Sequence, residues 1–114
     1  MKQVKGSISF KDLWKKLFSN SQTDQRRLQY AEKGRDGYVI YKDPKGEISM
    51  YFEFGGGDCI AMISLPTEQE WTKQLKRDPA ERAAFIQFTA DQATRDKAPG
   101  CRYRLSGNWI EIYK

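Results

Sequence analysis

The sequence predicts an α+β domain with a single antiparallel sheet, in which a three- to four-stranded meander is followed by a C-terminal hairpin. We expect one N-terminal helix and two central helices, packed mainly on one face of the sheet. Three observations lead to this prediction. Three runs of β-branched and aromatic residues are separated by turn signals, an amphipathic segment precedes them, and two helix-capping motifs follow them.

The length of 114 residues suits one domain with one core. We therefore treat 1–114 as a single domain, with 1–7 as a flexible N-terminus and 19–27 as a polar internal linker. The net charge is +5, and the basic excess lies mainly in the first third of the chain. No apolar run approaches the roughly 20 residues that span a bilayer, and no signal-peptide pattern is visible. We expect a cytoplasmic protein without membrane contact.

Residues 8–18, ISFKDLWKKLF, are expected to form the N-terminal helix. Ser9 is a suitable N-cap, and Asp12 stands at the third helical position, where a capping box has its acidic residue. Five large apolar residues recur at helical spacing and form one stripe: Phe10, Leu13, Trp14, Leu17 and Phe18. We expect this stripe to cover the sheet rather than to lie on lipid.

Residues 28–33 allow two interpretations. Leu28 and Tyr30 alternate as in a strand that turns into the meander, whereas a helix would end at Gly34 in the left-handed conformation common after helix ends. The alternation favours the strand.

The meander is expected over residues 38–65. Within it, Ile48, Met50, Phe52 and Phe54 alternate with polar neighbours, so we expect these four side chains to face the helices. Asp-Pro-Lys-Gly at 43–46 fits a type I turn. The run from residue 59 to 65 is apolar on both faces, which is typical of a central strand.

The two central helices are expected to start at capping boxes, Thr67 to Glu70 and Asp78 to Glu81. The first helix is short and buries Trp71. The second extends to about Lys97 and carries apolar residues over a wide arc, so we expect it to be the most buried helix.

The last segment, CRYRLSGNWIEIYK, predicts a hairpin with a two-residue turn near Gly107. Its alternation places Arg102, Arg104, Trp109 and Tyr113 on one face, where we expect a binding surface. Aromatic rings and guanidinium groups are enriched at protein interfaces. They also stack on bases and hold phosphates.

Few residues in the chain suit catalysis. The absence of histidine excludes Ser-His-Asp and Cys-His catalysis and histidine metal sites. Cys59 and Cys101 are expected to be buried thiols, because free cysteine is usually buried and the chain has no histidine to activate it. Cys101, beside Arg102, is the better of two weak candidates for a nucleophile. The glycine-rich loop at 55–57 joins two strands rather than opening a helix, so we interpret it as a hairpin loop. Glu53 and Asp58 flank that loop and are the carboxylate pair to inspect.

We therefore expect a non-enzymatic protein-binding domain of an adaptor, chaperone-like or inhibitor-like kind, with no cofactor and no metal. The order of elements resembles, at the level of the fold alone, that of small bacterial secretion chaperones, although those are typically acidic. One alternative is nucleic-acid binding through the basic and aromatic sheet face. A second is a small enzyme using carboxylate or cysteine chemistry. The oligomeric state stays open.

Overall fold

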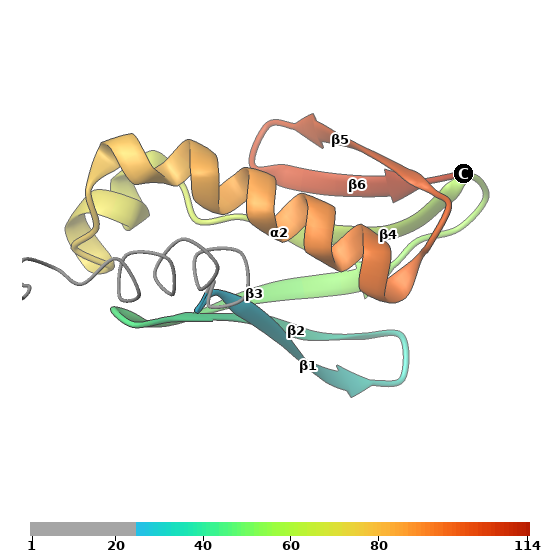
Figure 1. Ribbon diagram of the computed structural model, residues 1–114. Coiled ribbons are helices and arrows are strands. Elements are labelled where there is room, and N and C mark those ends of the chain that lie inside the picture. The colour runs from blue at the N-terminus through green and yellow to red at the C-terminus, as the bar shows by residue number, and fades with distance from the viewer. Residues whose placement is uncertain (1–24) are drawn as a thin grey trace, which may run out of the picture.

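The computed structural model describes residues 25–114, and these form one six-stranded antiparallel sheet with an α-helix across one face (Figure 1). The strand order is β1-β2-β3-β4-β6-β5, so β1 and β5 lie at the two edges. The strands are β1 (Arg27–Lys33), β2 (Asp36–Asp43), β3 (Gly46–Phe54), β4 (Cys59–Ser64), β5 (Arg102–Ser106) and β6 (Trp109–Tyr113).

The meander prediction is confirmed. Strands β2, β3 and β4 pair consecutively and antiparallel, and β4 lies inside the sheet between β3 and β6. At the turn between β2 and β3, the Lys45 N–H donates to the Asp43 carboxylate at 2.9 Å, which holds the expected tight turn. Residues 28–33 belong to β1, so the strand interpretation of this segment is correct. Strand β1 begins at Arg27, inside the range predicted as a linker.

The core lies between the sheet and α2 (Arg82–Lys97). Of the four alternating residues in β3, Ile48, Met50 and Phe52 are buried and Phe54 is half-buried. From the helix, Phe85 packs edge-on against Tyr41 of β2, with the ring centroids 4.8 Å apart. Strand β6 contributes two fully buried isoleucines at positions 110 and 112.

The predicted set of helices is wrong. The expected N-terminal helix at residues 8–18 lies outside the described residues. Of the two expected central helices, only the second exists as an α-helix among residues 25–114. The first is replaced by one π-helical turn, η1 (Glu70–Gln74), and a single 3-10 turn, η2 (Pro79–Glu81), precedes α2. The fold is therefore strand-rich, with one α-helix in the described part of the chain.

The first capping box forms, but it does not start a long helix. The Thr67 N–H donates to the Glu70 carboxylate at 2.8 Å, and the Glu70 N–H donates to the Thr67 hydroxyl at 3.0 Å. The turn ends at Lys76, whose φ of 54° is left-handed and incompatible with a continuing α-helix. The next N–H, of Arg77, donates back to the Trp71 carbonyl at 3.0 Å and closes the turn.

The second capping box forms only in part. The Asp78 carboxylate accepts from the Ala80 N–H at 2.9 Å, as expected of an N-cap. The Glu81 carboxylate instead accepts two hydrogen bonds from the Lys45 ammonium, at 2.9 and 3.0 Å. Glu81 therefore links the start of α2 to the β2–β3 turn.

A buried ion pair links the segment after η1 to the sheet. The Arg77 guanidinium donates two hydrogen bonds to the Asp43 carboxylate, at 2.7 and 3.0 Å, and the two side chains are 7% and 11% exposed. The guanidinium lowers the pKa of Asp43 below its ordinary value. The Tyr41 hydroxyl also donates to Asp43, and burial together with this carboxylate raises the pKa of Tyr41 to about 12.

Strands β3 and β4 are paired over only a short stretch. Their register covers three residue pairs, from Phe52–Ile63 to Phe54–Ala61. By comparison, β2 pairs with β3 over its whole length. Beyond Ser64 the chain leaves β3 and turns toward η1, so two three-stranded halves meet at this short ladder (Figure 1).

Candidate functional site

The terminal hairpin positions the predicted binding residues. Strands β5 and β6 pair from Arg102–Tyr113 to Ser106–Trp109, with a two-residue turn between them. In that turn Gly107 has a φ of 59°, whereas Asn108 has no positive φ, which is the combination found in a type II′ turn. This turn type matches the twist of antiparallel strands and fixes the register.

The hairpin register places Arg102, Arg104, Trp109 and Tyr113 on the sheet face opposite α2. We call these four residues the hairpin patch. The inward positions of β6 are the buried Ile110 and Ile112, so the patch residues alternate with core residues. Both arginines are exposed, and Trp109 and Tyr113 are half-buried. The face assignment follows the prediction, while the binding role of the patch stays a prediction.

Within the patch, three of the four side chains meet. The guanidinium carbons of Arg102 and Arg104 lie 5.2 Å and 5.0 Å from the centroid of the Tyr113 ring. Contacts of this kind contribute about 0.5–1 kcal/mol each at exposed sites. Trp109 lies at the other end of β6, opposite Ser106, so the hairpin does not bring its indole to the same cluster.

One carboxylate lies inside the hairpin patch. Glu111 occupies the position between Trp109 and Tyr113 on the same face, and it accepts a hydrogen bond from the Arg104 Nε at 2.7 Å. This interaction raises the pKa of the Arg104 guanidinium. The carboxylate offsets one of the two arginine charges, so the patch is less basic than its arginines alone suggest.

The same sheet face continues onto the meander with two exposed tyrosines. Tyr38 and Tyr51, at 48% and 36% exposure, pack edge to face with ring centroids 6.2 Å apart. The Tyr51 hydroxyl donates to the Asp36 carboxylate at 3.1 Å. Strict alternation in β3 predicts that Tyr51 faces outward, but the pairing with Tyr38 depends on the strand register.

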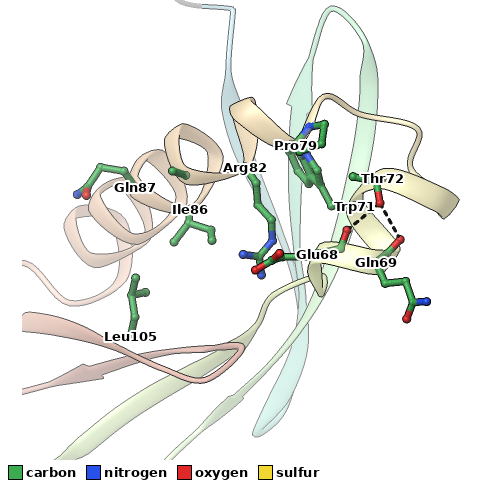
Figure 2. A pocket seen from close by; sticks show the side chains of 10 residues that line it. Glu68, Gln69, Trp71, Thr72, Pro79, Arg82, Ile86, Gln87 and Leu105 are labelled. Carbon is green, nitrogen blue, oxygen red and sulfur yellow. Dashed lines mark hydrogen bonds between the residues drawn. The ribbon is translucent and has the colours of Figure 1, made fainter.

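Sequence reasoning missed a groove on the helix side of β5. It has a volume of about 740 Å³ and lies between the first turns of α2, η1 and the edge strand (Figure 2). Leu105 stands toward it from β5, and Ile86 points toward it from α2 (Figure 2). Leu105 is 54% exposed, an unusual state for a large apolar side chain on the core side of a sheet.

The residues considered for catalysis do not form a cluster. The Glu53 carboxylate accepts a hydrogen bond from the Tyr51 hydroxyl at 3.4 Å, while Asp58 is exposed in the β3–β4 loop. Cys59 and Cys101 are both half-buried, so the expectation that they are fully buried thiols is wrong. Within residues 25–114, no group of three or more cysteine and acidic side chains is placed to hold a metal ion.

None of the helices in the described range is long and apolar enough to cross a membrane.

Comparison with known proteins identifies no relative. Searches against protein-family models, curated proteins and solved structures find no match to this chain, so the assignment of a function depends on the geometry of its surfaces.

Proposed function

We propose that this protein functions by binding another protein through the hairpin patch, in a reducing compartment such as the cytoplasm. The observation that supports the proposal is the clustering of two guanidinium groups around Tyr113, with Trp109 on the same face. Arginine, tyrosine and tryptophan are the residue types that most often dominate binding energy at protein interfaces. The unpaired Cys59 and Cys101 fit a reducing compartment.

Nucleic-acid binding is the second candidate. Rings and arginines on a sheet face can stack bases and contact phosphates. Glu111 argues against this use, because its carboxylate lies in the middle of the patch and would repel a phosphate backbone. A protein partner can instead accommodate mixed charge, so we favour protein binding.

A pull-down from native lysate, with and without nuclease, tests the proposal. The chain is compared with Trp109→Ala, and the matched control is Tyr38→Ala, which removes an exposed ring from the same face outside the hairpin. We expect Trp109→Ala to lose the captured protein while Tyr38→Ala retains it. Capture should survive nuclease and decline only slightly between low and physiological salt.

Two results would contradict this proposal. Loss of capture after nuclease, together with a steep salt dependence, would favour nucleic acid, because neutralising phosphates releases counterions. Equal capture by the two variants would show that the hairpin patch is not the interface. Thermal unfolding of each variant checks that the fold is intact, since Trp109 is half-buried.

A further inference from the structure

Strand β5 presents backbone groups at a sheet edge. It pairs with β6 on one side, and no other strand within residues 25–114 pairs with it. Antiparallel ladders alternate hydrogen-bonded and non-hydrogen-bonded pairs. In a two-residue hairpin the pair that closes the turn, here Ser106–Trp109, is hydrogen-bonded. The N–H and C=O groups of Arg104 therefore point to β6, and those of Tyr103 and Leu105 point to the edge.

The groove lies directly beside this edge. Leu105 extends from β5 toward it, and Ile86 points toward it from α2 (Figure 2). The exposed Ala83 of α2 adds further apolar surface. A strand placed beside β5 would point every second side chain to the helix side, into the groove. Farther along β5, the Tyr103 hydroxyl donates to the Asp91 carboxylate of α2 at 2.8 Å.

At the opposite sheet edge, two side chains near the end of α2 bond to β1. The Tyr30 hydroxyl of β1 donates to the Asp96 carboxylate of α2 at 2.7 Å. The Lys97 ammonium lies 2.6 Å from the Glu32 carboxylate. These two links bring α2 side chains over β1, and the Tyr103–Asp91 hydrogen bond does the same at one part of β5. Among residues 25–114, the end of β5 at Leu105 instead borders the groove. The two edges therefore differ in the space they offer to another strand.

The other face of β5 is positively charged. Arg102 and Arg104 are exposed there, and their side chains alternate with Tyr103 and Leu105 along the strand. An added strand would place its remaining side chains next to these arginines, where acidic residues are favourable cross-strand neighbours. Strand β5 thus offers the groove on one face and, on the other, two arginines, of which Arg104 already pairs with Glu111 of β6 while its guanidinium stays exposed.

We propose that β5 binds an extended segment of a partner protein as a seventh strand, antiparallel to β5, in which apolar residues alternate with acidic residues. This inference rests on the proposed function of protein binding and names the kind of partner. Main-chain hydrogen bonds to Tyr103 and Leu105 supply affinity, as in other complexes formed by strand addition. The groove and the two arginines select the alternating pattern.

A second copy of this chain is a poorer occupant of the edge. When two β5 strands pair over all five residues in a symmetric antiparallel arrangement, Arg104 lies opposite Arg104. Like charges directly opposite each other destabilise a strand pair. An acidic segment removes this repulsion, so charge complementarity favours a different protein.

The probe is the synthetic peptide acetyl-(Glu-Val)4-amide, with acetyl-(Lys-Val)4-amide as its charge-reversed control. Binding to the full chain is measured by calorimetry, and amide hydrogen exchange locates the contact. We expect the glutamate peptide to bind at least tenfold more tightly than the lysine peptide. At saturation it should slow exchange of the Tyr103 and Leu105 amides at least tenfold and leave the Tyr30 amide of β1 unchanged.

Two further comparisons test the hydrogen bonds and the side chains separately. In the proposed antiparallel pairing the valine N–H groups face β5, so N-methylation of the valines should abolish binding, whereas N-methylation of the glutamates should preserve it. Leu105→Glu should weaken binding at least tenfold, whereas Tyr38→Glu, at a similarly exposed position on the other face, should not. The double variant Arg102→Glu, Arg104→Glu should reverse the preference between the two unmethylated peptides.

The outcomes distinguish this inference from the proposed function. Equal binding of the two methylated peptides, or protection of β1 instead of β5, overturns strand addition at β5. Concentration-dependent dimerisation with protected Tyr103 and Leu105 amides also overturns it, because the occupant is then a second copy. If Trp109→Ala still abolishes capture in the pull-down, protein binding by the hairpin patch stands while the β5 inference fails. If capture also fails, the proposed function fails as well.

Discussion

Replacement of Arg77 by methionine removes the positive partner of the buried ion pair with Asp43. Removing one partner of such a pair typically costs about 3–5 kcal/mol, because the remaining charge is left without compensation. The Asp43 carboxylate would keep its hydrogen bonds from the Lys45 N–H and the Tyr41 hydroxyl. We therefore expect the cost of Arg77→Met to lie at the lower end, about 3 kcal/mol.

Urea unfolding at neutral pH measures this cost. With a slope of about 2 kcal/mol per molar urea, the midpoint should fall by roughly 1.5 M. Lys45→Ala is the matched control, since it breaks an ion pair whose side chains are 60% and 47% exposed. Exposed pairs contribute at most about 1 kcal/mol. If Arg77→Met costs no more than Lys45→Ala, the link between η1 and the sheet does not stabilise the fold as we argue.

Three more predictions concern particular side chains. Arg77 lowers the pKa of Asp43 from its ordinary value of 3.8, so the ion pair stabilises the fold fully above about pH 3.8. This stabilisation is lost as the pH falls through the lower pKa of the folded state. Acid titration should therefore bring the stability of the native chain toward that of Arg77→Met. Gly37→Ala places a Cβ 2.1 Å from a carbonyl oxygen of β1, so it should lower the free energy of unfolding in urea by at least about 2 kcal/mol. Gly56→Ala, with open space around the added Cβ, should change it by less than about 0.5 kcal/mol. Tyr30→Phe removes the hydrogen bond to α2 and should cost about 1 kcal/mol in thermal unfolding, and an unchanged midpoint would argue against that contact.

The sheet could be predicted because its signals are local. Alternation with a period of two marks β3. Two-residue turns with well-placed proline or glycine mark the β2–β3 and β5–β6 hairpins. The same alternation places Arg102 and Tyr113 on one face of the terminal hairpin. Each of these inferences needs only neighbouring residues, which is why they agree with the structure.

The prediction of the first central helix failed because its outcome depends on distant residues, whereas the prediction of the second, ending at about Lys97, agrees with α2. A capping box at Thr67 normally indicates a helix, but Arg77 is held by Asp43, which is far away in the sequence. That ion pair favours a chain that turns back after η1. The groove beside β5 depends on how α2 packs across the sheet, and no pattern of neighbouring residues in the sequence predicts that packing. The exposure of Leu105 follows from the same crossing.

The short ladder between β3 and β4 has a consequence for how the protein opens. Native proteins unfold locally in cooperative units, and two units joined by few backbone hydrogen bonds separate from each other first. The β1-β2-β3 half is built from neighbouring segments of the chain, whereas β4 and β6 join residues that are far apart in sequence. We expect the first half to form quickly and the second to form late, because long-range strand pairing requires closure of a long loop. Mechanical pulling across the sheet would then separate it between Phe52 and Ile63 before either half unravels.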